Sequence, residues 1–343
     1  MAGPVKRVWT DTQRLEWREL AHAFRMEREA ARAKATREAA GFAYICGDLH
    51  MHTVYSDGSG SVDDMVKVAN ARGMDFIFVT DHSTVRQKVE CRKYPNVWWG
   101  QEPGAGPQHV CILAGERKYT PCGDMKTDAE RLRALGYYFF YPHPVGWYPH
   151  NWFSEGQKDA LAEVGPEFAI EVMNGIFRAE AFHEEWEEGY IALWDRYLTA
   201  GYRVTGLGAT DAHFAPGVGN VWTGVLGARR TMGSVLKVLR AGCVFASSGP
   251  AVNLTCGRTP MGGTVRTKKP TARIRIQCAD SYGLAWVRVV QDGCAAREVE
   301  CRGKQLLNED VDLELGAKGG YVRVECAAAD DRRAYSNPIY FER

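Results

Sequence analysis

Apolar strand-like runs and amphipathic helix-like segments alternate from about residue 42 to residue 249. The pattern predicts strands at residues 42–46, 76–80, 97–100, 109–114, 137–141, 168–173, 203–209 and 221–226. It predicts helices at residues 62–72, 126–135, 179–200 and 232–241. Such alternation is typical of parallel strands joined by crossover helices, so we expect an α/β fold whose strands close into a barrel or nearly so.

The two ends of the chain show different patterns. Residues 10–40 predict one long helix, because apolar positions recur at helical spacing between Asp11, a candidate cap, and Gly41, which ends it. After Ser248-Gly249-Pro250 the period changes to two, as in residues 272–276 and 321–325. We therefore predict an N-terminal helical segment (1–41), a barrel (42–249) and a small antiparallel, β-sandwich-like domain (250–343).

Composition argues against several classes of protein and several kinds of site. The 343 residues carry a formal net charge of +1, which gives no support for an extended polyanion track. No apolar run reaches the roughly 20 residues that span a bilayer, and the first residues lack the apolar core of a secretory signal. The cytoplasm is the expected location. The ten cysteines form no Cys-x-x-Cys pair, which argues against a zinc ribbon or a thioredoxin-like site.

Potential metal ligands gather just after the predicted strands. Five of the nine histidines lie there: His50, His52, His82, His143 and His213. Residues i and i+2 of an extended segment project from the same face, so His50 and His52 can both reach one cation. Asp57 and Asp211 add carboxylates beside them. Because ligands bind at the carboxyl ends of strands in α/β folds, the sequence predicts a metal site at this end of the barrel.

Four ordered motifs carry a resemblance to a known family. They are His50-x-His52 with Ser56-Asp57-Gly58, Thr80-Asp81-His82, His143-Pro144, and Asp211-x-His213. Together they resemble the PHP (polymerase and histidinol phosphatase) superfamily of metallohydrolases, and are most similar to its carbaryl-hydrolase-like branch. The resemblance covers residues 42–249. It implies a distorted (β/α)7 barrel and two or three divalent ions. A site rich in carboxylates accepts zinc, manganese or iron, and the sequence does not choose among them.

The resemblance also implies the ligands of each ion. The first ion would be held by His50, His52, a bridging glutamate and Asp211; the second by Asp57, His82 and His213; and the third by the same glutamate, a nearby histidine and His143. For the glutamate we favour Glu102, which is followed by His109, while Glu116 stays open as the alternative. We assign the catalytic roles to Asp57, His82, Glu102, His143, Asp211 and His213.

Clustered divalent ions suit hydrolysis, because they lower the pKa of a bound water and can clamp the attacking and leaving oxygens. With a metal-bridging hydroxide as nucleophile, we favour a phosphoesterase acting on a small phosphate ester or nucleotide. Arg178 or Lys118 could pair with the phosphate, or be ordinary surface charges. The aromatic loop that begins at Trp147 keeps two other readings open, an aryl carboxylic or carbamic ester hydrolase and simple packing.

A different class of protein would be a non-catalytic metal-binding module that serves as an interaction domain. Such a module is expected to have lost ligands, and here every expected ligand position can be filled. We expect a small-molecule substrate, no membrane contact, and nucleic acid only as a nucleotide-type substrate. Assembly into a homo-oligomer stays open.

Overall fold

The computed structural model describes residues 11–147, 151–175 and 183–343. Its helices are α1 (Asp11–Ala40), α2 (Val62–Ala71), α3 (Lys88–Cys91), α4 (Met125–Ala134), α5 (Glu155–Asp159), α6 (His183–Thr199) and α7 (Met232–Arg240). The strands of the first part are β1 (Tyr44–Asp48), β2 (Phe76–Val79), β3 (Val97–Gln101), β4 (Cys111–Leu113), β5 (Tyr138–Phe140), β6 (Gly146–Trp147), β7 (Asn151–Trp152), β8 (Glu167–Asn174), β9 (Arg203–Ala209), β10 (Trp222–Leu226) and β11 (Val244–Ser247). The C-terminal strands are β12 (Ala251–Cys256), β13 (Thr259–Pro260), β14 (Thr264–Arg266), β15 (Thr271–Gln291), β16 (Cys294–Glu314), β17 (Gly319–Ala328), β18 (Arg333–Ser336) and β19 (Ile339–Glu342).

Strands of the first part follow one another in a closed succession. Strands β1 to β5 are hydrogen-bonded in chain order, and β8 pairs with β9. A parallel bridge between Tyr141 and Ile170 joins the end of β5 to β8. A second bridge, between Met51 and Ala212, joins the residues after β9 to those after β1. The residues that follow β1, β2, β3, β5 and β9 therefore meet at one end of these strands.

The predicted all-parallel arrangement is wrong for several strands. Pairs β1–β2, β2–β3 and β8–β9 are parallel, but β3–β4, β4–β5, β1–β10 and β10–β11 are antiparallel. The β3–β4 connection contains only one short 3-10 turn (Gly106–Gln108), and a parallel crossover needs a dozen or more residues. Helices α4 and α7 connect antiparallel strands, β4–β5 and β10–β11. The alternation of strands and helices in the sequence looks the same for such a connection as for a parallel crossover. The protein is a mixed α/β fold.

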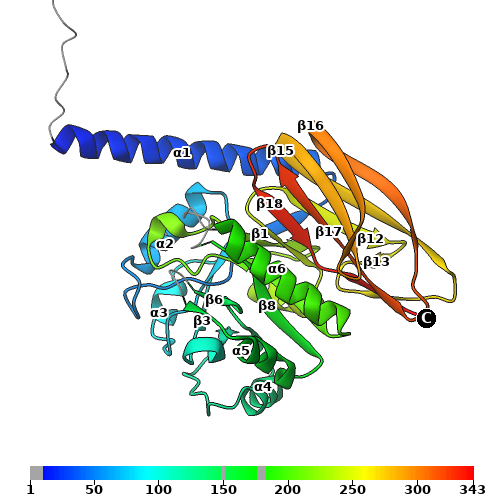
Figure 1. Ribbon diagram of the computed structural model, residues 1–343. Coiled ribbons are helices and arrows are strands. Elements are labelled where there is room, and N and C mark those ends of the chain that lie inside the picture. Colours follow the sequence, from blue (N-terminus) through cyan, green and yellow to red (C-terminus); the bar gives the residue numbers. More distant parts are fainter. Residues whose placement is uncertain (1–10, 148–150, 176–182) are drawn as a thin grey trace, which may run out of the picture.

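The C-terminal part is an antiparallel sheet built around two long strands, β15 and β16, which form a hairpin through Asp292 and Gly293 (Figure 1). Irregularities in the β15–β16 register fall between Ala279 and Trp286, and again before Val290. Within this part only β14–β19 is parallel among the described strands. The sandwich-like arrangement stays a prediction.

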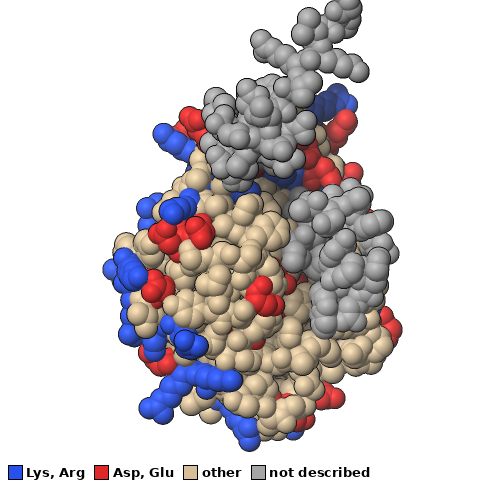
Figure 2. Space-filling model, turned by 90° about the vertical axis from the view of Figure 1, so that its left-hand side faces the viewer, with Lys and Arg blue, Asp and Glu red and all other residues tan. Residues whose placement is uncertain are grey.

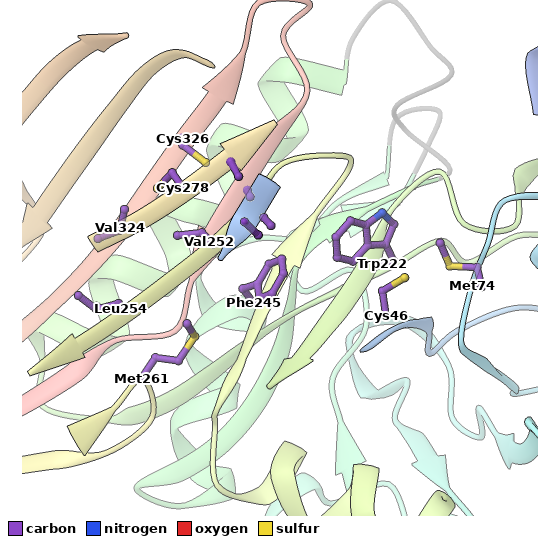
Figure 3. Close-up of a cluster of buried hydrophobic side chains, with 14 of the residues drawn as sticks. Cys46, Met74, Trp222, Phe245, Val252, Leu254, Met261, Cys278, Val324 and Cys326 are labelled. Atoms are coloured by element: carbon purple, nitrogen blue, oxygen red, sulfur yellow. The ribbon is translucent and has the colours of Figure 1, made fainter. Parts of the chain in front are cut away.

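The two parts share a sheet and a core. Strand β11 pairs with β18, so the hydrogen bonding continues across residue 250. Figure 3 shows the same continuity in the side chains, where Trp222 and Phe245 of the first part lie in one cluster with Val252 and Val324 of the second. Helix α1 lies along the top in Figure 1, where Thr36 and Arg32 bond Ser281 and Asp330 of the C-terminal sheet. No helix in the described part of the chain has the length and apolarity needed to cross a membrane.

Candidate metal centre

The segment after β1 is held by two buried aspartates that flank the histidine pair. Asp48 accepts hydrogen bonds from the backbone and hydroxyl of Thr210 and from the amide of Gly219, at 2.5–3.0 Å. Burial raises the pKa of Asp48 to about 6, although these bonds oppose the shift. Asp81 accepts from the amide and hydroxyl of Thr53 and from Ser56 Oγ, at 2.7–2.8 Å. Both carboxylates are thus used to position loops around the site.

The loop between His52 and Gly60 also depends on one glycine. The amide of Gly58 donates to the carbonyl oxygen of Thr53, 3.1 Å away, which closes a tight turn. A Cβ atom on Gly58 would collide with the carbonyl oxygen of His52. This close approach of two backbone segments requires glycine, and it places Asp57 back over His52.

His50, His52, Glu102 and Asp211 form an inner group that is buried. The Nε2 atoms of the two histidines lie 3.0 Å apart. Glu102 Oε2 is 3.3 Å from each of them, and Asp211 Oδ1 is 3.0 Å from His52 Nε2 and 3.3 Å from His50 Nε2. Four potential ligand atoms therefore converge on one point.

Asp57, His82 and His213 form an outer group with His52. Asp57 Oδ2 lies 3.4 Å from His82 Nε2 and 3.3 Å from His213 Nε2. His52 Nδ1 faces Asp57 Oδ1 at 3.6 Å and has no hydrogen-bond partner among the described residues. The Asp57 side chain is 52% exposed, so this group opens to solvent.

Glu102, His109 and His143 form a third group on the other side of the inner one. Glu102 Oε1 lies 3.1 Å from both His109 Nδ1 and His143 Nε2, which are 3.4 Å from each other. Its second oxygen, Oε2, faces the inner group. One carboxylate that is only 1% exposed thus serves both groups.

Histidine tautomers are set by the acceptors at Nδ1. His82 Nδ1 lies 3.2 Å from the carbonyl oxygen of Glu102, and His213 Nδ1 lies 2.9 Å from that of Asp211. A carbonyl oxygen only accepts, so the proton sits on Nδ1 and leaves each Nε2 as a lone-pair donor toward Asp57. Metal-binding histidines are commonly oriented in this way.

The Nδ1 atom of His50 likewise faces an acceptor, the carboxylate of Glu171, which the sequence reasoning missed. Glu171 Oε1 lies 2.8 Å from His50 Nδ1, while Oε2 accepts from the backbone amide of His143 at 2.9 Å and from Asn174 Nδ2 at 2.8 Å. Glu171 is fully buried in the middle of β8, whose neighbours are apolar. A lone carboxylate inside an apolar strand is the signal that could have identified it.

Backbone strain is found at two of these positions. His143 and Asp211 have φ values of 34° and 53°, in a region that non-glycine residues rarely occupy. The parallel bridge beside Asp211 and the Glu171 bond to the amide of His143 hold the two backbones in place. Such strain is characteristic of functional sites.

The pKa values reflect the close packing of imidazoles and carboxylates. Burial lowers the pKa of His52, but Asp211 and Glu102 outweigh it and raise the value to about 9. Burial raises the pKa of Glu102, yet His50, His109 and His143 hold it well below its usual range. The neighbouring histidines likewise lower the pKa of Asp211 against its burial. Without a cation the cluster retains protons, which a divalent ion must displace.

The donor set fits divalent metal ions. Imidazole nitrogens and carboxylate oxygens bind zinc, manganese and iron. Two ligand atoms at about 2.0–2.1 Å from one ion, at the tetrahedral angle, are about 3.3 Å apart. The separations of 3.0–3.3 Å in the inner group match this value. The unpartnered, buried His52 Nδ1 is a second sign that a ligand belongs there.

The structure brings all nine predicted ligands into the three groups. Glu116, the alternative to Glu102, lies outside them; it is 56% exposed and pairs with Lys88 at 2.9 Å. Lys118 is exposed in the segment after β4. Arg178 lies outside the described residues, and so does the side chain of Trp147, although its backbone forms part of β6.

Two family models match segments of the chain that contain most of these residues. Residues 48–125 match the family model of the PHP domain, and residues 196–244 match a model described as PHP-associated. The first segment contains six of the nine predicted ligands, the second contains Asp211 and His213, and His143 lies between them. No curated protein matches the chain.

Three solved structures align with parts of this chain. A two-domain protein from Bacteroides vulgatus, containing a predicted PHP-like metal-dependent phosphoesterase, is 17% identical with a TM-score of 0.46, over 88% of this chain and 96% of that one. A candidate metal-dependent phosphoesterase from Bifidobacterium adolescentis is 16% identical with a TM-score of 0.38, over 57% and 95%. An amidohydrolase from Chromobacterium violaceum, with bound sulfate and no metal, is 14% identical with a TM-score of 0.33, over 49% and 87%.

Proposed function

We propose that this chain is a metal-dependent phosphoesterase of the PHP type that hydrolyses a small phosphate ester. The observation that carries the proposal is the position of Glu102, whose two oxygens face two different groups of potential ligands. A carboxylate in this position could bridge two ions, and paired ions can clamp the attacking and leaving oxygens in hydrolysis. The closed succession of strands β1–β5, β8 and β9 would be the distorted (β/α)7 barrel that carries the site.

Each group would hold one ion, as the resemblance implies. The inner group would be the most firmly organised, because its histidines are buried and Glu171 orients His50. Divalent ions bound in the three groups would stabilise the negative charge that develops on a phosphoryl group and would activate water for attack. The histidine and carboxylate ligands would fix the positions of the ions before the substrate binds, so the stabilising charge is already in place.

Access to the site differs among the groups. Asp57, His82 and His213 are 52%, 32% and 30% exposed, whereas His50 and His52 are fully buried. A substrate phosphate would therefore approach from the side of the outer group. Asp57, His82, Glu102, His143, Asp211 and His213 remain our proposed catalytic residues, and Lys118 and Arg178 our proposed phosphate partners.

An extended nucleic acid is a weaker candidate for the substrate. On the face seen in Figure 2, Lys and Arg lie mainly along the margins, and the middle is uncharged apart from a few acidic groups. A polyanion bound across this face would find no continuous basic track. Together with the net charge of only +1, this supports a small substrate.

One observation favours an aryl ester or carbamate as the alternative substrate. Phe214 is 47% exposed directly after His213, and Val54 is 60% exposed two residues after His52. The backbone amide of Ser59 donates to the carbonyl oxygen of His213 at 2.7 Å, so the two segments are neighbours. An apolar rim beside the open group would suit an apolar or aromatic substrate moiety.

The test is hydrolysis by purified protein loaded in turn with manganese, zinc and iron. An aryl phosphate, an aryl ester and an aryl N-methylcarbamate are compared, with Asp57→Asn as the blank and Glu116→Gln as the matched control. The proposal expects metal-dependent turnover of the phosphate that Asp57→Asn abolishes and Glu116→Gln preserves. Turnover of only the ester or carbamate would replace the phosphoesterase assignment, and no turnover with any metal would favour a non-catalytic metal-binding module.

A further inference from the structure

A hollow lies at the opposite end of the strands from the metal ligands. Its volume is about 510 Å³, and it is lined by the first residues of β5, β8 and β9, the end of α7, and β19. His143 and Asp211 follow the last residues of β5 and β9, whereas this groove contains Tyr138 and Arg203 from their beginnings. At about 3.3 Å per residue, the seven residues of β9 separate the two places by about 20 Å.

Three arginines converge on this groove, which we call the arginine groove (lined by Arg133, Arg203 and Arg240). Arg133 donates to the carbonyl oxygen of Glu167 at 2.8 Å, and Arg203 Nε lies 3.4 Å from the carboxylate of the same residue. Arg240 donates to the carbonyl oxygen of Gly136 at 2.6 Å, three residues beyond Arg133. The lining thus holds three guanidinium groups and one carboxylate, that of Glu167, which lies against Arg203, so its net charge is positive.

Carbonyl oxygens leave this charge in place. Arg203 donates to Thr264 Oγ1 at 2.8 Å and to the carbonyl oxygen of Gly262 at 3.2 Å. These neutral acceptors fix the orientation of the guanidinium, and the Glu167 carboxylate is the only contact among the described residues that offsets its charge. The groove thus presents oriented cations, which suit an anionic ligand with several acceptor oxygens.

Aromatic side chains form the remaining wall. Tyr137, Phe139 and Tyr340 are partly exposed there. The guanidinium of Arg203 lies 4.2 Å from the centre of the Tyr340 ring, which stacks the cation on the ring. Partly exposed rings beside oriented cations offer a planar group a stacking surface next to its own negative charge.

One buried polar atom near the groove lacks a hydrogen-bond partner in the described part of the chain. Tyr138 lines the groove and is 7% exposed, and its hydroxyl has no hydrogen-bond partner among the described residues. Burying a hydroxyl without a partner costs about 1–3 kcal/mol, so such groups usually meet a ligand or a water. The unsatisfied hydroxyl is buried behind the groove, so the proposal below does not depend on its reaching a ligand.

From this placement we propose that the arginine groove is a second ligand site, separate from the metal centre, for a small organic anion that carries a planar ring. A mononucleotide has this chemistry. Its phosphate would meet the guanidinium groups, and its base would stack on the exposed rings. The site requires no metal ion.

The test is isothermal titration of the full-length protein with adenosine 5′-monophosphate, inorganic phosphate and adenosine. We expect saturable binding of the nucleotide that is tighter than that of either fragment. Arg203→Gln and Arg240→Gln should each weaken it about tenfold or more, because each removes a charge-assisted contact. Glu167→Gln should strengthen it, because that carboxylate offsets the arginines.

Two control variants test whether binding depends on the arginine groove itself. Arg273→Gln removes an exposed arginine that pairs with Asp312 on the C-terminal sheet, and it should leave binding unchanged. Asp57→Asn disables the proposed metal centre and should also leave binding unchanged, which separates this site from the proposed function. The inference is overturned if the nucleotide does not bind, if Asp57→Asn alone abolishes binding, or if phosphate binds as tightly as the nucleotide.

Discussion

Glu171→Gln is the substitution that most sharply probes the organisation of the metal centre. The carboxylate accepts on both sides, from His50 Nδ1 at 2.8 Å and from the His143 amide at 2.9 Å. An amide can accept at only one end. If its oxygen stays beside the His143 amide, its NH2 group faces His50 Nδ1 and forces the proton onto Nε2. His50 then loses the lone pair that points into the inner group.

Turning the amide around does not solve the problem. The NH2 group would then face the backbone amide of His143 and Asn174 Nδ2, two donors in a fully buried place. Either orientation leaves a mismatched buried pair. Loss of such a supporting partner typically lowers metal affinity about 10- to 100-fold, or about 1.4–2.8 kcal/mol.

The assay is competition for zinc or manganese against a chromophoric chelator, with metal content per chain measured in parallel. Glu130→Gln, on the exposed side of α4, is the matched control and should bind metal like the wild type. Unchanged affinity in Glu171→Gln would refute the proposed orientation of His50.

Four other predictions follow from the same contacts. Glu102→Gln should lower the metal content of two groups at once, whereas Glu116→Gln should not; equal metal content in the two variants would remove Glu102 from the bridging role. Gly58→Ala should reduce the free energy of unfolding by about 1–3 kcal/mol in urea titrations, while Gly156→Ala, in helix α5 with open space around it, should leave it unchanged or raise it slightly. Arg323→Met should cost about 3 kcal/mol by the same method, because it leaves Asp195 without its cation, while Glu325 keeps Arg288; a loss below about 1 kcal/mol would contradict this. Chelation of bound metal should lower the melting temperature of the wild type as measured by calorimetry, and adding the metal back should restore it.

Local sequence patterns located the elements of the fold well. The strand predicted at residues 203–209 is β9, and the helix predicted at residues 232–241 differs from α7 by one residue. Strand direction was the main error, since an apolar run looks the same whether its neighbour is parallel or antiparallel. Pairings such as β1–β10 and β11–β18 join residues far apart in the sequence, which no local pattern encodes.

The candidate site was visible in the sequence where ligand residues cluster at strand ends. His50 and His52, and likewise Asp211 and His213, stand close enough in the chain to suggest a shared function. Glu171 was not visible in this way, because it lies within a strand and acts on His50, 121 residues earlier in the chain. Its partner could be found only once the fold had brought β8 against the segment after β1.

The central claim, that the three groups hold divalent ions, is tested most directly by anomalous diffraction from crystals of the manganese- or zinc-loaded protein. The account predicts more than one anomalous peak per chain, with one peak among His50, His52, Glu102 and Asp211. Peaks that lie elsewhere, or none after loading, would contradict it.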